Sequence, residues 1–517
     1  MSVKAKARPG AAAGGAQLAL PLFQTSKRRR LERLGVVDVG SNSVRLVVFD
    51  GAARSPAYFF NEKILCGLGA GVAETGRLNP EGRARALMAL KRFALLAENM
   101  EATPLYAVAT AAVREAEDGP DFVAEVARAT GLRLNVASGA EEARLSAQGV
   151  LLGWPGARGL MCDIGGSSME LAEIEEGTVG RAATSALGPL KLAPFGTGQR
   201  LLDEIERRVA RLRAEFDEDY RNLFLVGGSW RAIARIDMER RAYPLKVLHE
   251  YAMTPEGAVE TAEWIGTRDL SDLRALTGAS PERLRLVPVA ALVLRALIRR
   301  FTPEQIAVSS YGIREGLLFE QMPKRLRKRD PLIEACLFME RASARNPGFG
   351  KVLYDFLRPI YRHETRARKR LVKAACLLHD VTWRAHPDYR AEVCFDSATR
   401  ANLGGLDHAG RVFLGVALLN RYKNSGVGAG FEGVVGLLDD KTRREAEVLG
   451  KAMRFGAMLS GATTRMRCAL KLHRRDRVLE LQLHPEAQDL FGEVVQARFE
   501  SLARALGCKT RLSVAAL

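Results

Sequence analysis

The stretch "MCDIGGSSMELAEI", residues 161–174, places an aspartate at the end of an apolar run and follows it with glycines and hydroxyl residues. Its apolar flanks predict two buried strands. A turn of small residues between them leaves backbone N–H groups free, and such groups can cradle an anion. Glycine and serine also favour ordinary turns, so this stretch taken alone favours a simple β-hairpin.

The whole chain has 517 residues and a formal net charge of +18. This length predicts several domains, and a composition of 47% hydrophobic and 27% charged residues is typical of a globular protein. Residues 1–34 carry +7 of the charge and predict a disordered basic tail. The remaining +11 is compatible with nucleic acid, an anionic membrane or a phosphorylated substrate as partner.

Several protein classes are excluded by pattern. No apolar run reaches the roughly 18 residues of a membrane span, and Val287–Ile298 comes nearest. The basic run "SKRRR" follows the apolar run "GAQLALPLF", contrary to the order in a secretory signal. The seven cysteines form no CxxC pair, which argues against a disulfide framework or a thiolate zinc site. We therefore expect a cytoplasmic protein with no membrane partner.

The periodicity of the chain predicts a tail and four further units. Alternating strands and helices fill residues 35–150, and the same alternation restarts in 151–324 after "GWPGARG". The proline-bounded basic segment "PKRLRKRDP" is the main boundary, and almost wholly helical sequence follows over 325–460. Residues 461–517 predict a small α/β domain of strand, strand, helix and strand.

An internal repeat favours a functional turn, and two structural hairpins of a duplicated fold stay the open alternative. The segments "VVDVGSNSVRLVVF" and "LMCDIGGSSMELAEI" match at Asp38 and Asp163, and the interval of 125 residues (163 less 38) recurs at further matched positions. Two such turns, each opening a domain-sized unit, predict a duplicated fold with a cleft between its halves. There the turns can hold a phosphate chain from opposite sides, while the two aspartates help to bind a metal cation.

Three other strand-to-helix turns are rich in small or hydroxylated residues, and each carries an arginine: Arg114, Arg231 and Arg314. Amides at a helix start and a guanidinium group both bind phosphate well. We favour Arg114 for this role and expect Arg231 and Arg314 to form surface or interdomain salt bridges. In "SGAEEARL", Glu142 is expected to face inward as a general base and Glu141 to face water.

Five segments, in this order, resemble the exopolyphosphatase/guanosine pentaphosphate phosphohydrolase family: "VDVGSNSVRLVV", "ATAAVRE", "SGAEEARL", "CDIGGSSMEL" and "SYGIREGLLFE". The resemblance covers roughly residues 35–325. It implies an α/β fold of two actin/sugar-kinase-like (ribonuclease H-like) lobes with a central cleft. It further implies an all-helical HD-like domain and a small C-terminal α/β domain.

The resemblance also implies roles for individual residues. Glu142 matches the catalytic base and Arg114 a phosphate-binding arginine. Asp163 and Glu170 match acidic positions near a Mg²⁺ ion, the ion for which the repeat also predicts Asp38 as a ligand. The phosphate-binding loops correspond to Gly40, Ser41, Asn42 and Ser43 and to Gly165, Gly166, Ser167 and Ser168.

Two departures from the family pattern concern the lobes and one the helical domain. "GGSS" replaces three glycines in the second loop, and "GGSWRAIA" replaces a small-Gly-Thr sequence. In "AACLLHDV", His379 and Asp380 form the dyad that names HD domains, but His363, Asp396 and Asp407 offer no convincing further ligands. We therefore expect the dyad to be a structural relic.

The predicted function is Mg²⁺-dependent hydrolysis of terminal phosphate from linear inorganic polyphosphate, by a hydrolase of phosphoric anhydrides that we expect to be a homodimer. Basic residues of the linker and helical domain are expected to guide the polyanion to the cleft. Hydrolysis of guanosine pentaphosphate at the same site is the close alternative. An ATP-dependent kinase of the same superfamily and a non-enzymatic polyanion-binding protein are more distant ones. Nucleic acid is not the expected partner.

Overall fold

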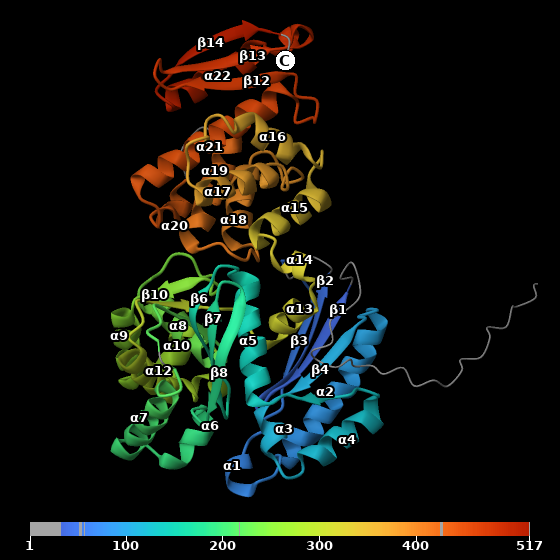
Figure 1. Cartoon of the computed structure of the whole chain (residues 1–517), viewed down its shortest axis with the longest axis vertical. Coiled ribbons are helices and arrows are strands. Elements are labelled where there is room, and N and C mark those ends of the chain that lie inside the picture. Colours follow the sequence, from blue (N-terminus) through green and yellow to red (C-terminus); the bar gives the residue numbers. More distant parts are fainter. Residues whose placement is uncertain (1–32, 51–53, 56, 217, 424–427, 516–517) are drawn as a thin grey trace, which may run out of the picture.

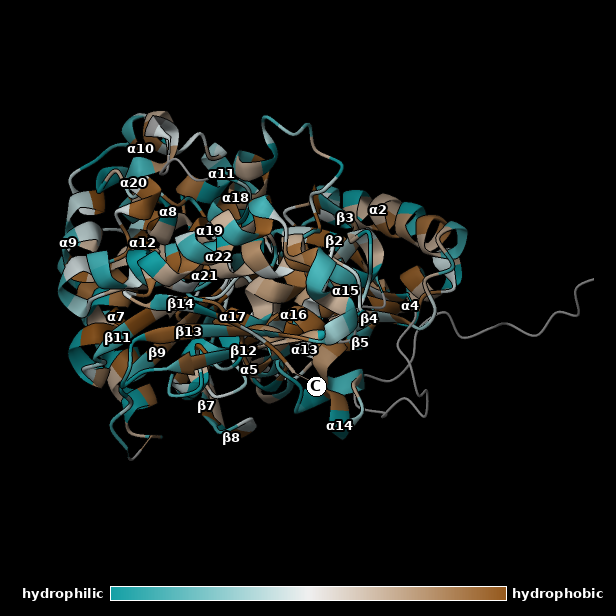
Figure 2. Ribbon diagram, turned by 90° about the horizontal axis from the view of Figure 1, so that it is seen from above, coloured by the Kyte–Doolittle hydropathy of each residue, from teal (hydrophilic) through white to brown (hydrophobic). Residues whose placement is uncertain are grey.

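The computed structural model describes residues 33–515 apart from 51–53, 56, 217 and 424–427, so the predicted basic tail lies almost wholly outside the described residues. Two α/β lobes lie side by side, a helical domain sits on one end of them, and a small α/β domain follows (Figure 1). The hydrophobic colour gathers along the strands, while outward helix turns are mostly hydrophilic (Figure 2). Each sheet therefore forms part of a buried core.

Lobe I contains a five-stranded sheet of order β3-β2-β1-β4-β5. The predicted strand–turn–strand over residues 34–50 is confirmed, because β1 and β2 pair antiparallel, whereas β1 and β4 are parallel. The strands are β1 (Leu34–Val39), β2 (Ser43–Asp50), β3 (Ala57–Leu65), β4 (Leu105–Ala109) and β5 (Asn135–Val136). The helices are α1 (Val72–Thr75), α2 (Pro80–Asn99), α3 (Ala111–Glu115) and α4 (Gly119–Thr130), and α4 ends at Gly131 as predicted.

Lobe II repeats this topology. Its order is β10-β11-β9-β6-β7-β8, so β6, β7, β8, β9 and β11 occupy the places of the five lobe I strands. The duplication inferred from the repeated turns is thus present in the strand order. The strands are β6 (Arg158–Ile164), β7 (Met169–Glu175), β8 (Thr178–Ser185), β9 (Asn222–Val226), β10 (Tyr251–Met253) and β11 (Gln305–Val308). The helices are α6 (Pro189–Leu192), η1 (Ala193–Phe195), α7 (Gln199–Arg213), α8 (Gly228–Arg240), α9 (Pro255–Gly266), α10 (Leu270–Thr277), α11 (Pro281–Leu284) and α12 (Val287–Phe301).

Two closely packed helices join the lobes: α5 (Gly139–Gly153) and α13 (Ile313–Gln321). Their backbones touch, since a Cβ added to Gly316 would lie 1.7 Å from the Leu145 carbonyl oxygen. Both helices contribute to a core cluster that contains residues of both lobes. The predicted boundary between residues 150 and 151 therefore falls inside α5, a helix that belongs to the junction of the lobes.

The helical domain follows the basic linker. Its core cluster combines residues from α15 to α21 with residues of the small C-terminal sheet. The helices are α14 (Lys324–Arg327), α15 (Pro331–Ser343), α16 (Phe349–Leu357), α17 (Arg366–Leu378), α18 (Arg390–Arg400), α19 (His408–Tyr422), η2 (Ala429–Phe431), α20 (Glu432–Val435) and α21 (Asp440–Leu459).

The C-terminal part confirms the predicted order of strand, strand, helix and strand. It contains β12 (Cys468–His473), β13 (Val478–Leu483), η3 (Pro485–Leu490), α22 (Glu493–Ala505) and β14 (Lys509–Val514). Phe455 of α21 stacks on Phe499 of α22 with ring centroids 5.1 Å apart, which ties this part to the helical domain. All seven cysteines are free. Within the described residues, no helix is both long and apolar enough to cross a membrane.

Candidate active site

The two glycine-serine loops are closed by the same backbone hydrogen bond. In each, the N–H of the first residue donates to the carbonyl oxygen of the last, at 3.0 Å in loop 40–43 and 2.9 Å in loop 165–168. The loops face each other across the cleft, where the hydroxyl oxygens of Ser41 and Ser167 are 3.4 Å apart. The structure therefore brings together the two turns that the sequence predicts to hold a phosphate chain from opposite sides.

Gly227 of the "GGSWRAIA" turn also belongs to this arrangement. It follows β9 with a φ of 115°, which an L side chain rarely adopts. An added Cβ would lie 2.5 Å from the Ile164 carbonyl oxygen and 3.0 Å from Asp163 Oδ1. The turn therefore needs glycine because its backbone lies against the strand that carries Asp163.

Glu142 has the inward orientation that helical spacing predicts. At the start of α5, Ser138 and Glu141 form a reciprocal capping box, which fixes the first turn of the helix. The next residue, Glu142, is buried in the wall of the cleft. Nη1 of Arg114 lies 3.1 Å from Glu142 Oε2 and 2.7 Å from the Ala137 carbonyl oxygen. Burial, assisted by the nearby Asp163, raises the pKa of Glu142 to about 7 against the opposing effect of Arg114. This carboxyl group is suited to exchange a proton near neutral pH.

Asp163 and Glu170 stand opposite each other in the β6–β7 ladder. The Ser146 hydroxyl donates to Asp163 Oδ2, and the Thr184 hydroxyl lies 3.2 Å from Glu170 Oε1. Burial raises the pKa of both carboxyls, and for Glu170 the charges of Glu142 and Asp163 raise it further. Glu170 Oε2 is buried without a hydrogen-bond partner among the described residues. The cluster therefore keeps one buried oxygen without a hydrogen-bond donor among the described residues.

Asp38 lies on the other side of the cleft. Arg314 Nη1 approaches its Oδ2 at 3.5 Å, and Arg45 is its partner in the β1–β2 ladder. Burial raises the pKa of Asp38, while Arg314 and then Arg45 oppose the rise. The expected interdomain salt bridge of Arg314 is thus present, and it occupies one oxygen of a carboxylate predicted to bind metal.

Cations surround the acidic cluster in a cleft of about 650 Å³. Arg231 and Arg314 line it, although Arg114 was the favoured phosphate ligand of the three. The sequence reasoning missed three other lining cations, Arg45, Lys63 and Arg283. Burial and then the charge of Arg283 lower the pKa of Lys63 to about 8. An extended anion is the ligand that this lining fits.

Of these three cations, only Arg45 could have been predicted to lie in the cleft from the sequence. A tight turn after Val39 forces antiparallel pairing, which sets Arg45 opposite Asp38. Lys63 comes from β3 and Arg283 from the short helix α11, far apart in sequence, and only the tertiary structure brings them to one cleft.

The oxygen donors of the cluster suit a hard divalent cation such as Mg²⁺, and the unpartnered Glu170 Oε2 fits one. Within residues 33–515, excluding the undescribed gaps, no three His, Cys, Asp or Glu side chains converge closely enough to hold an ion alone. An ion here would need oxygens from water or substrate, which is how proteins commonly hold Mg²⁺.

The His379–Asp380 dyad has a different environment. Arg345 binds Asp380 with both arms, Nε to Oδ2 at 2.8 Å and Nη2 to Oδ1 at 2.7 Å. The His379 ring donates from Nδ1 to the Cys376 carbonyl oxygen at 2.9 Å, and burial lowers its pKa to about 4. Asp407 caps α19 and Asp396 pairs with Arg400, so neither completes a metal site.

Comparisons with known proteins agree with this geometry. A family model described as the Ppx/GppA phosphatase family matches residues 47–325, and one described as Exopolyphosphatase, C-terminal, matches residues 353–513. The second match runs across the predicted boundary at residues 460 and 461, in keeping with the core that the two parts share.

Named relatives align with about half to two thirds of this chain. "Exopolyphosphatase 1" of Mycobacterium leprae is 29% identical over 310 residues, which cover 56% of this chain and 89% of the relative. A guanosine-5'-triphosphate,3'-diphosphate pyrophosphatase of Aeromonas hydrophila is 25% identical over 363 residues, which cover 67% of this chain and 72% of the relative. The solved exopolyphosphatase of Cytophaga hutchinsonii, 22% identical, has a TM-score of 0.53 and covers 56% of this chain and 98% of its own. It shows the fold of the lobes.

Proposed function

The chain belongs to the Ppx/GppA phosphatase family, and from this premise we propose that it is an exopolyphosphatase. The reaction is hydrolysis of the terminal phosphoanhydride bond of linear inorganic polyphosphate, which releases orthophosphate. The observation that carries the proposal is the position of Glu142, a buried carboxyl with its pKa near 7, beside the two facing loops.

In the proposed mechanism Glu142 accepts a proton from the attacking water. Arg114 holds the carboxylate in place through Oε2 and leaves the other oxygen, Oε1, to accept that proton. The backbone N–H groups and hydroxyls of the two loops bind the terminal phosphate. Arg45, Arg231 and Arg314 neutralise charge that develops on the phosphoryl and leaving groups.

We propose Mg²⁺ as the cofactor, with Asp163 and Glu170 as the carboxylates that would hold it. When bound, it supplies Lewis-acid stabilisation of phosphoryl oxygens. Asp38 is a weaker candidate because Arg314 already engages it. Neutralising this cluster would also lower the pKa of Glu142 and favour its basic form.

Hydrolysis of guanosine pentaphosphate is the second candidate. The Aeromonas hydrophila relative is named for that substrate, and it aligns over a larger share of this chain than the exopolyphosphatase of Mycobacterium leprae. The same carboxylates and loops would serve either terminal phosphate.

The kinase and the non-enzymatic alternatives have less support. A kinase of the same superfamily needs a second-substrate site, for which no residues are assigned. A binding protein needs no buried general base beside a carboxylate cluster, whereas Glu142, Asp163 and Glu170 all lie together. A nucleic-acid-binding protein does not need these buried carboxylates either, so nucleic acid is not proposed as the partner.

The test is phosphate release from polyphosphate, guanosine pentaphosphate and ATP, each with and without Mg²⁺. We expect the largest kcat/KM for polyphosphate and a requirement for the ion. A larger kcat/KM for guanosine pentaphosphate would favour the second candidate, and ATP consumption that requires an acceptor would favour a kinase.

Four finer predictions stay proposals: the actin/sugar-kinase-like identity of the lobes, the HD-like identity of the helical domain, a homodimer and a cytoplasmic location. The common strand order of the two lobes supports the first. The position of His379–Asp380 in a helical domain supports the second.

A further inference from the structure

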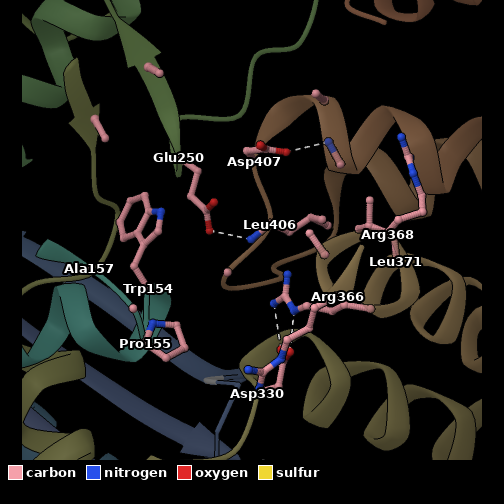
Figure 3. Close-up of a pocket in the computed structure, with 18 of the residues that line it drawn as sticks. Trp154, Pro155, Ala157, Glu250, Asp330, Arg366, Arg368, Leu371, Leu406 and Asp407 are labelled. Carbon is pink, nitrogen blue, oxygen red and sulfur yellow. Dashed lines mark hydrogen bonds and ion pairs between the residues drawn. The ribbon is translucent and has the colours of Figure 1, made fainter. Parts of the chain in front are cut away.

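A second large cavity lies between lobe II and the helical domain, with a volume of about 1010 Å³ (Figure 3). Its lobe II wall includes the first residues of three parallel strands: Arg158 of β6, Asn222 of β9 and Gln305 of β11. The cleft lies at the other end of the same strands, where Asp163 and Val226 line it. The two cavities are therefore at opposite edges of one sheet.

Helix α5 gives the separation of the two sites. Its first turn carries Glu142 into the cleft, and Trp154, directly after its end, lines the second cavity. Fifteen helical residues span about 22 Å at 1.5 Å per residue. A small ligand in the second cavity therefore cannot touch the catalytic residues.

Cations outnumber anions in the walls of this cavity. Lining residues include six basic side chains, Arg158, Lys328, Arg329, Arg366, Arg368 and Arg370, and three acidic ones, Glu250, Asp330 and Asp407. The linker cations were expected to guide substrate to the cleft. Lys328 and Arg329 instead line a cavity on the opposite side of the lobe.

Four of the six cations already have carboxylate partners. Arg370 pairs with Asp330, Arg368 with Glu445, Arg329 with Glu334 and Arg158 with Glu175. Within the described part of the chain, Lys328 and Arg366 have no ion-pair partner. These two charges come from the linker and from the start of α17, on the helical-domain side of the cavity.

Two of the acidic residues, Asp407 and Glu250, make contacts that reduce the effect of their negative charge in the cavity. Asp407 accepts the N–H of Gly410 at 2.7 Å as the cap of α19. Glu250 accepts the N–H of Leu406 at 2.7 Å, and burial raises its pKa to about 7. The cavity thus keeps a surplus of positive charge for a ligand.

Trp154 gives the cavity a flat apolar wall, on the other side of the view from Arg366 and Arg368 (Figure 3). Its ring is 5.5 Å from Phe224 and 4.8 Å from His249 by centroid, contacts that hold it in position. Arg54 fixes the preceding helix end, since it donates to the carbonyl oxygens of Leu152 at 2.8 Å and of Arg329 at 3.0 Å. The wall is therefore built before a ligand arrives.

We propose that this cavity is a second anion site, which binds an oligophosphate group through Lys328 and Arg366. The group could be supplied by inorganic oligophosphate or by a nucleoside di- or triphosphate, whose base would lie against Trp154. Bidentate guanidinium contacts and an ammonium point charge suit phosphate oxygens from either source. The volume is at the upper end of that for small-molecule sites.

The test measures the binding of tripolyphosphate and of ADP to the full chain in the presence of EDTA. Tryptophan emission and calorimetry are the two readouts. The double variant Lys328→Glu/Arg366→Glu is compared with Lys351→Glu/Arg358→Glu, which makes the same charge change on exposed positions of α16 and its end. We expect the first to lose one binding event and the control to keep it. Equal stoichiometry and affinity in both variants would overturn the proposal.

Two further variants keep the test independent of misfolding and identify the source. Arg366→Lys preserves the charge, so it should keep at least part of the binding that the double variant Lys328→Glu/Arg366→Glu loses. If Arg366→Lys unfolds like the wild type but binds no better than the double variant, the result counts against the site. Trp154→Leu should weaken ADP binding several-fold and leave tripolyphosphate unchanged if the ligand is a nucleotide. If tripolyphosphate and ADP each bind Trp154→Leu with the same affinity as the wild type, the site is assigned to inorganic oligophosphate.

Discussion

The cleft and the helical domain each contain acidic residues that resemble a metal site in sequence, but their environments are opposite. In the cleft, Asp163 raises the pKa of Glu142, both of these residues raise the pKa of Glu170, and one Glu170 oxygen has no hydrogen-bond partner among the described residues. In the helical domain, Asp380 is held by both arms of Arg345. In the first group Arg114 engages Glu142 but one Glu170 oxygen stays without a donor, whereas in the second an arginine engages both oxygens of Asp380.

This difference teaches that the partners of a carboxylate decide its role more than the motif that contains it. A buried carboxylate without a counter-charge is costly, so it persists where a ligand or metal compensates for it. A bidentate arginine removes that need and closes the site. The hypothesis that the dyad is a structural relic is consistent with this arrangement and can be tested against the cleft.

The largest effect is expected from removing the carboxylate charge of Glu142 in the cleft. Glu142→Gln keeps the shape of the side chain but not its basicity, so kcat should fall by about 10²–10⁴-fold with little change in polyphosphate binding. Steady-state kinetics and equilibrium binding measure the two effects. Glu141→Gln is the matched control, because that residue only closes the capping box. A larger loss in Glu141→Gln would mean that the base is misassigned.

A second contrast concerns metal dependence. Asp163→Asn should raise the Mg²⁺ concentration for half-maximal activity by about 10–100-fold, since an amide binds a hard cation less well than a carboxylate. Activity titrated with Mg²⁺ gives the value, and Asp380→Asn in the helical domain serves as the comparison. An unchanged titration in Asp163→Asn would place the ion elsewhere.

The pH profile tests the electrostatics of the cleft. Because Glu142 must be deprotonated to act as a base and its pKa is about 7, kcat/KM should fall about tenfold per pH unit below that pKa. Arg114 favours the charged form, so Arg114→Ala should move this limb to higher pH, whereas bound Mg²⁺ should move it lower. Profiles of kcat/KM for both proteins measure the shift. A limb that moved to lower pH in Arg114→Ala would contradict the assigned pairing.

The smallest effect on catalysis is expected in the helical domain. Asp380→Asn removes a charge-assisted contact whose arginine is partly exposed, so the free energy of unfolding should fall by about 1–2 kcal/mol with kcat unchanged. Urea unfolding and equilibrium dialysis against Mn²⁺ would check stability and metal content. If the wild type bound an ion that Asp380→Asn lost, the dyad would be a metal site after all.

Much of the fold follows from local patterns. The turn after Asp38 and the turn after Asp163 each force a hairpin, and their constant spacing reveals the duplication later seen in the strand order. Helical periodicity alone turns Glu142 inward once Ser138 caps α5. These features were predictable because each depends on residues within a few positions of one another.

The sequence by itself therefore determined the duplicated lobes, the two loops, the inward orientation of Glu142 and the order of the C-terminal elements. Only the tertiary structure decided that Arg45, Lys63 and Arg283 share the cleft and that Arg345 closes the dyad. It also placed the linker cations around a second cavity. The physical reason is range: backbone pattern is set by neighbours in sequence, whereas the charge around a side chain is set by residues that only folding brings near.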